Sequence, residues 1–140
     1  MLNKLKVFVY GTLKPGERNY QKYCAGKVVE AKRAIAFGQL FALPMGYPAM
    51  TPGDTPVSGF LLSFANPDIL HILDELEDYD PNRAQAQNGY NRVQIDTYKP
   101  GGEPLATAWV YLMTPERVSL HRGVLLPLGW WSSSGRSPSA

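Results

Sequence analysis

The chain has 140 residues, of which 44% are hydrophobic and 19% are charged. This length suits one ordinary domain with a buried core, and the composition excludes intrinsically disordered proteins and bundles of membrane-spanning helices. The formal net charge is only +2 and the lysines and arginines form no basic run, so nothing indicates a nucleic-acid or membrane partner.

Short apolar segments along the chain predict a domain rich in β-strands. Residues 6–10 (KVFVY) are the first, and Gly11 ends this strand with a turn. Gly38 and Gly59 lie inside later predicted strands and indicate bulges or a close backbone approach. Further strands are predicted at residues 33–43, 57–64, 92–98 and 106–113, with a KPGGEP hairpin turn between the last two. Between two of them, residues 44–56 (PMGYPAMTPGDTP) hold four prolines and two glycines and are predicted as a loop.

One segment, residues 66–78, is predicted as a helix. Asn66 is a favourable N-cap, Pro67 fits the first helical position, and Asp68 suits the positive end of the helix dipole. The following residues 79–81 (YDP) end the helix. Strands around a single predicted helix indicate an α+β fold with a curved or closed sheet.

Cysteine and histidine are too few for an ordinary metal site. Only Cys24, His71 and His121 are present, with no HExxH or Cys-x-x-Cys pattern beside them. One cysteine forms no intrachain disulfide, which favours a cytoplasmic location. Cys24 lies in no recognisable motif, so a structural thiol is favoured, and a Cys24–His dyad remains an open alternative.

Glu77 stands out on the predicted helix. Ile69, Leu70, Leu73 and Leu76 form one apolar stripe, and Glu77 lies within roughly 20° of Leu70 on a helical wheel. A carboxylate on the apolar side must be paired, hydrogen-bonded or protonated, and desolvation there raises its pKa toward the range useful for proton transfer. The alternatives are a frayed last turn that turns Glu77 toward water, or a structural ion pair with Arg83 or Arg92. The other carboxylates of this segment, Asp74, Glu75 and Asp78, are expected at the solvated edge.

The turn after the first strand is a second candidate feature. Tyr10-Gly11-Thr12-Leu13 places a glycine where the backbone turns, and such a turn exposes consecutive N–H groups that hold a carboxylate or an oxyanion. It lacks the Gly-Lys-Ser/Thr of a phosphate-binding P-loop.

Several short motifs, in this order, resemble the γ-glutamylcyclotransferase-like (AIG2-like) family over residues 7–113. They are VYGTL at 9–13, GYPA at 46–49, LDxxEDY at 73–79, YxR at 90–92 and AWVY at 108–111. Asp78 departs from the glycine that is commoner in the family, and Thr12 stands where many members have serine. The resemblance implies a small mixed β-barrel with flanking helices.

The resemblance also implies an activity, the release of 5-oxoproline from a γ-glutamyl amino acid or γ-glutamyl amine without a cofactor or metal. Glu77 then matches the catalytic residue of the family, and Tyr10, Gly11, Thr12 and Leu13 match its substrate-binding loop. As further substrate-binding residues we expect Tyr47, in the motif that resembles the family's substrate-side loop, together with Arg92 and Tyr111. The expected partner is this small molecule alone, with neither nucleic acid nor membrane. A different lyase or acyl-transfer reaction on a related amide, and a non-catalytic module that binds a small ligand, are the alternatives.

One domain is expected over residues 1–131. The Ser-rich segment 132–140 is expected to be a disordered tail.

Overall fold

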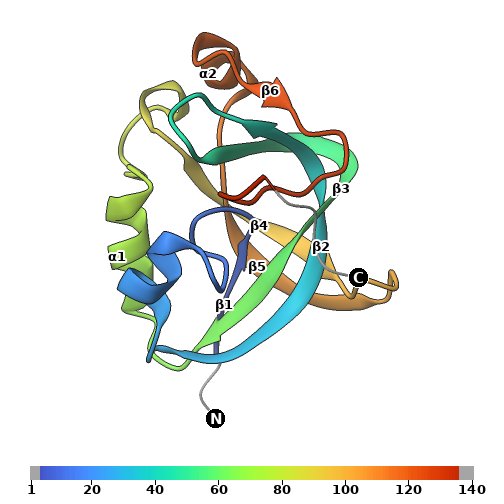
Figure 1. Ribbon diagram of the computed structural model, residues 1–140. Helices are drawn as coiled ribbons and strands as arrows, with labels where there is room; N and C mark the ends of the chain where they lie inside the picture. Colours follow the sequence, from blue (N-terminus) through green and yellow to red (C-terminus); the bar gives the residue numbers. More distant parts are fainter. Residues whose placement is uncertain (1–3, 136–140) are drawn as a thin grey trace.

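The computed structural model describes residues 4–135, and the domain is built around one mixed sheet (Figure 1). In chain order the elements are β1 (Leu5–Val9), a π-helical turn (Tyr20–Cys24), β2 (Val28–Ala42), β3 (Pro48–Phe64), α1 (Ile69–Leu76), a 3-10 turn (Gln85–Gln87), β4 (Asn91–Tyr98), β5 (Pro104–Leu112), α2 (Pro115–Leu120) and β6 (Val124–Leu125). None of the helices within residues 4–135 has the length and apolar character that a membrane span requires.

The sheet closes on itself. Its strand order is β3-β1-β5-β4-β2-β6, and β2 also pairs with β3, so five strands form a ring to which the short β6 is added. β1 and β5 run parallel, and the other pairs are antiparallel. A single bridge, Ile35 with Tyr98, joins β2 to β4. This arrangement confirms the predicted α+β barrel with flanking helices (Figure 1).

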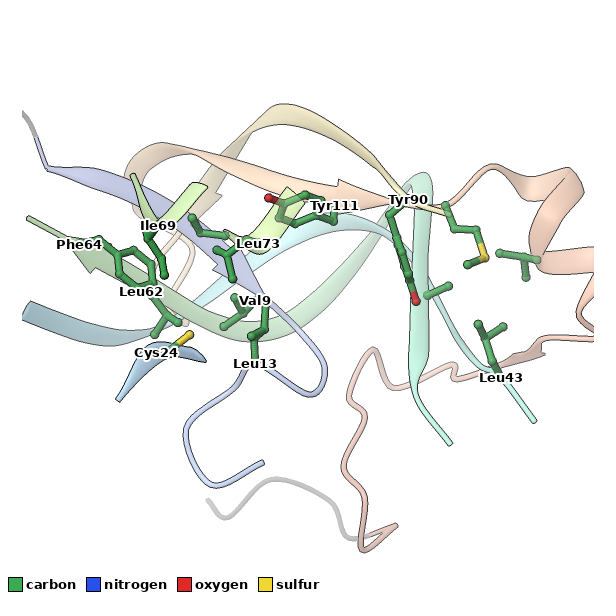
Figure 2. Packing of buried hydrophobic residues seen from close by; sticks show 14 residues of the cluster. Val9, Leu13, Cys24, Leu43, Leu62, Phe64, Ile69, Leu73, Tyr90 and Tyr111 are labelled. Carbon is green, nitrogen blue, oxygen red and sulfur yellow. The ribbon is translucent and has the colours of Figure 1, made fainter. Parts of the chain in front are cut away.

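Alternation along the strands divides the buried residues between two cores. In β1, Phe8 points into the ring of strands and packs in a cluster with Val57 and Val110. Its neighbours Val7 and Val9 belong to the second cluster, on the outer face of the sheet that α1 covers (Figures 1 and 2). Burial on both faces explains why this strand is a continuous apolar run.

The proline-rich segment 44–56 was predicted as a loop, and this is wrong for most of its length. Only residues 44–47 of this segment lie outside the strands, because β3 begins at Pro48 and pairs with β2 from there. Thr51 and Thr55 pair with adjacent residues of β2, so residues 52–54 bulge out of the ladder. The strand tolerates its prolines because Pro48 stands at its first position, Pro52 lies within this bulge and Pro56 lies next to it.

Both strand glycines have a steric role, as predicted. A Cβ on Gly59 would lie 2.2 Å from the Val9 carbonyl oxygen, which shows how closely β1 and β3 approach. A Cβ on Gly38 would lie 2.5 Å from the Thr51 oxygen, at the register shift opposite the bulge. The KPGGEP hairpin is also confirmed, with Gly102 at φ +99° and its N–H donating to Lys99.

Helix α1 is shorter than predicted at both ends. It begins at Ile69, although the Asn66 side chain still accepts a hydrogen bond from the Asp68 N–H at 2.9 Å. At the other end the Tyr79 N–H donates to the Asp74 carbonyl and the Asp78 N–H donates to the Glu75 carbonyl. These two bonds, with Asp78 at φ +54°, form a Schellman motif that ends the helix and leaves Glu77 as its C-cap.

The segment after β6 crosses back over the barrel. Ser58 donates to the Gly129 carbonyl at 2.7 Å, and Trp131 is buried in the inner core. Of the predicted tail, residues 136–140 lie outside the described residues, whereas Ser133 donates to the Glu17 carboxylate at 3.4 Å. Disorder beyond residue 135 stays a prediction.

Candidate active site

A cavity of about 410 Å³ opens where the end of β1, the C-terminal end of α1 and helix α2 meet. This volume is within the range of small-molecule sites. Its wall combines backbone and side chains from several elements, among them Tyr10, Gly11, Thr12, Leu13, Arg18, Asn19, Tyr47, Pro48, Glu77, Asp78, Tyr90, Tyr111, Arg117 and His121.

Glu77 contributes the carboxylate of this cavity. Its N–H still donates to the Leu73 carbonyl at 2.9 Å, so the residue keeps the helical phase that directs its side chain inward. The Tyr90 N–H donates to the Glu77 carbonyl at 3.2 Å and holds the turn in place. No described residue donates a hydrogen bond to the Glu77 carboxylate, and burial raises its pKa to about 7. Neither Arg83 nor Arg92 is paired with it.

The loop after β1 contributes backbone N–H groups to the same cavity. The Lys14 N–H donates to the Gly11 carbonyl at 3.0 Å and the Asn19 N–H donates to the Thr12 carbonyl at 2.9 Å, which shapes the loop. Within residues 4–135, the N–H groups of Gly11, Thr12 and Leu13 donate to no protein acceptor. A Cβ on Gly11 would lie 2.7 Å from the Pro48 ring, so only glycine fits here. The structure thus brings together the loop and Glu77, which the sequence placed far apart.

Asp74 and Arg92 depart from their expected positions. Asp74 is not a solvated carboxylate, because it accepts a hydrogen bond from the Tyr111 hydroxyl at 2.7 Å and lies 2.9 Å from the Arg92 Nε. That Arg92 N–H is not aligned for a hydrogen bond, and the guanidinium instead stacks near Trp109, 4.4 Å from the ring centre. Arg92 does not line the cavity, so its predicted contact with substrate is not supported by its position.

The predicted tyrosines do reach the cavity, but their hydroxyl groups are already engaged. Tyr10 donates to the Tyr111 carbonyl at 2.6 Å and accepts from the Met50 N–H at 3.3 Å. Burial and the nearby Glu77 charge raise the pKa of the Tyr10 hydroxyl far above its usual range. The hydroxyl of Tyr111 is held by Asp74, so both side chains present rings rather than free hydroxyls. Tyr47 also lines the cavity, and its contact with substrate stays a prediction.

Tyr90 is a wall residue that the sequence analysis quoted in a motif but did not assign to the site. Its hydroxyl donates to the Pro48 carbonyl at 2.8 Å, and its ring belongs to the outer core together with Tyr111 (Figure 2). Burial raises its pKa, with smaller contributions from Tyr10 and Glu77. Tyr90 opens the YxR motif at residues 90–92, and this motif was the available signal.

Four polar wall residues were missed. Arg18 and Asn19 follow the substrate loop, and the Asn19 side chain donates to the Thr12 hydroxyl at 2.9 Å. Arg117 comes from α2 and His121 from its C-cap, forty or more residues after Glu77. Nothing in the sequence indicates that α2 returns to this side of the barrel.

The arrangement suits proton transfer next to an anion site. A carboxylate with a pKa near neutrality is able to accept and return a proton, and unpaired backbone N–H groups stabilise a carboxylate or an oxyanion. Among residues 4–135, no group of three or more His, Cys, Asp or Glu side chains is arranged to hold a metal ion.

Comparison with known families and proteins gives one consistent match. The family model described as "Gamma-glutamyl cyclotransferase, AIG2-like" matches residues 7–133. A γ-L-glutamyl-butirosin B γ-glutamyl cyclotransferase from Niallia circulans is 30% identical over 105 residues, which cover 75% of this chain and 65% of that protein. A putative γ-glutamylcyclotransferase from Halalkalibacterium halodurans is 33% identical over 102 residues, covering 71% of this chain and 83% of that protein.

Solved structures agree on the fold. The crystal structure of an AIG2-like protein from Mus musculus superposes with a TM-score of 0.68 at 22% identity, covering 95% of this chain and 91% of that one. The match to the Niallia circulans relative leaves about a third of that protein uncovered.

Proposed function

Because the chain belongs to the γ-glutamyl cyclotransferase, AIG2-like family, we propose that it releases 5-oxoproline from a γ-glutamyl amino acid or γ-glutamyl amine, with Glu77 as the general acid and base. The observation that carries the proposal is the single unpaired carboxylate of Glu77, with its raised pKa, in one cavity with the free N–H groups of Gly11, Thr12 and Leu13.

The reaction needs only one carboxylate. The α-amine of the substrate attacks its own γ-carbonyl carbon, so nucleophile and electrophile belong to the same molecule and the cavity only has to hold them in the cyclising rotamer. Glu77 accepts the proton that the attacking nitrogen loses. It then donates this proton to the departing nitrogen as the bond between that nitrogen and the γ-carbon breaks. The products are 5-oxoproline and a free amine, with no water consumed and no cofactor required.

The loop after β1 supplies the electrostatic stabilisation that the proposed reaction needs. A tetrahedral intermediate carries negative charge on the former carbonyl oxygen, and the substrate carries an α-carboxylate. The N–H groups of Gly11, Thr12 and Leu13 suit either anion, because they have no competing acceptor in the protein. The rings of Tyr10, Tyr90 and Tyr111 exclude water beside Glu77, which sustains its raised pKa.

In this proposal Arg92 is a positioning residue. Its charge lies beside Asp74, and Asp74 holds the hydroxyl of Tyr111, so Arg92 positions a wall residue without touching substrate.

The test is to incubate the protein with γ-glutamyl dipeptides and γ-glutamyl amines and to measure 5-oxoproline by chromatography. We expect turnover with at least one of them, and a loss of about 100-fold or more in Glu77→Gln, as for removal of a general acid and base. Unchanged turnover in Glu77→Gln would refute the assigned mechanism.

We propose one catalytic domain over residues 1–131 and a cytoplasmic location, which the single free thiol of Cys24 favours.

A further inference from the structure

Helix α2 and its C-cap give the cavity two polar side chains, Arg117 and His121, that the reaction described above does not use. Arg117 and His121 lie one helical turn apart, so both side chains project from the same side of α2, and both line the cavity. The cyclisation itself is served by Glu77 and by the N–H groups of residues 11–13. Arg117 and His121 are therefore available to a second group of the substrate.

Arg117 is held in place but is not satisfied. The hydroxyl of Thr114 accepts a hydrogen bond from the Arg117 N–H and caps the helix, which fixes where the side chain starts. One terminal nitrogen of the guanidinium donates to the Ala86 carbonyl at 2.9 Å. The Nε is buried and donates to no acceptor within the described chain, and no described carboxylate pairs with Arg117. Because this Nε is closed to solvent, a ligand carboxylate would meet the terminal nitrogens of the guanidinium, which lines the cavity and pairs with no described carboxylate.

The balance of charge in the cavity wall points the same way. Its acidic residues are Glu77 and Asp78, and Asp78 is already paired with Arg83 at 3.0 Å outside the lining. Arg18 is the other arginine of the wall, and it precedes the Asn19 that bonds to Thr12. A leaving group that carried a positive charge would meet Arg117 without a counter-charge.

We propose that Arg117 and His121 form a second anion site that binds a carboxylate on the leaving amine, so that the enzyme acts on γ-glutamyl amino acids or peptides in preference to γ-glutamyl amines. The substrate preference in turnover rests on the proposed function, whereas binding of the carboxylate at Arg117 and His121 does not. The α-carboxylate lies at the 11–13 loop and the carboxylate of the leaving group lies at α2, with the bond to be broken between them, beside Glu77.

The test uses two substrates that differ only in this carboxylate, γ-glutamyl-alanine and γ-glutamyl-alaninamide. We expect kcat/KM of the wild-type protein to be about tenfold or more higher for γ-glutamyl-alanine, as one charge-assisted hydrogen bond supplies. Arg117→Gln should lower kcat/KM for γ-glutamyl-alanine by about the same factor and leave that for the alaninamide within about twofold. Arg117→Lys should restore part of the preference. Arg122→Gln is the matched control, since Arg122 is exposed, follows His121 and does not line the cavity.

Equal kcat/KM for the two substrates in the wild-type protein would overturn the inference while leaving the proposed function intact. An equal loss for both substrates in Arg117→Gln would also overturn it, because Arg117 would then hold the α-carboxylate or merely brace the loop at Ala86. Binding to Glu77→Gln, measured by calorimetry, separates the two proposals. Tighter binding of γ-glutamyl-alanine than of its amide, lost in the double variant with Arg117→Gln, supports the site even if no 5-oxoproline forms. Equal binding, or none, refutes it.

Discussion

Glu77→Gln should make the protein more stable as well as inactive, and by an amount that depends on pH. Burial raises the pKa of Glu77 from 4.5 to about 7. Between these values the folded state keeps a proton that the unfolded chain has released, so the free energy of unfolding falls as the pH rises from 4.5 to 7. The full shift corresponds to about 3 kcal/mol. Glutamine has nearly the shape of the protonated acid and does not ionise, so the variant escapes this loss.

The difference between variant and wild type is therefore expected to approach zero below pH 4.5 and to reach about 3 kcal/mol above pH 7. Urea unfolding followed by tryptophan fluorescence at several pH values measures it, since the chain has three tryptophans. Comparing two proteins at the same pH cancels the titration of all other groups. Glu75→Gln is the matched control, because Glu75 is an exposed carboxylate of the same helix that does not line the cavity.

The same pKa predicts the acid limb of the activity. As a base Glu77 must be ionised, so kcat/KM of the wild-type protein should rise with pH through a midpoint near 7. A stability difference that is the same at pH 4.5 and pH 8, together with a flat activity profile over this range, would refute the reasoning from burial to proton transfer.

Three further substitutions test how the site is supported. Asp78→Gly should keep activity and raise the free energy of unfolding in urea by up to about 1 kcal/mol. Glycine adopts the φ of +54° without strain, and only the exposed ion pair with Arg83 is lost. A clear destabilisation would contradict this. Gly11→Ala should lower kcat/KM about tenfold or more with the fold retained by circular dichroism, since its Cβ would meet the Pro48 ring at 2.7 Å; full activity would show that the loop position is not critical. Lys14→Met should lower the free energy of unfolding, measured in heat or urea, by about 1–3 kcal/mol, because it removes the buried ammonium that donates to the Trp131 carbonyl. Unchanged stability would argue against this contact as an anchor of the C-terminal segment.

The family and its principal carboxylate could be recognised from local patterns. The phase of Glu77 relative to Leu70 and the turn at Gly11 are both set within a few residues, where periodicity and backbone preference act directly. The unusual Asp78 was visible as a departure from the family's glycine. The reason for the family's glycine became clear only in the Schellman motif, which requires a positive φ at that position.

Predictions were wrong where partners distant in the sequence set the environment or the conformation of a residue. Asp74 sits at the edge of the apolar stripe, and only β4 and β5 bring Arg92 and Tyr111 to it and convert a surface carboxylate into a half-buried one. The prolines between residues 44 and 56 looked like a loop, because local propensity does not show that a bulge opposite Gly38 accommodates them.

The sequence by itself determined that a small α+β domain carries a carboxylate on the wrong side of its helix and a glycine turn after its first strand. Both are local properties of backbone and side chain. The tertiary structure decided that Glu77 and the 11–13 loop share one cavity. It also decided that Arg117 and His121 line this cavity and that Arg92 does not line it. Closing a sheet into a ring joins segments whose separation along the chain carries no signal in a single sequence, so these juxtapositions exist only once the barrel has formed.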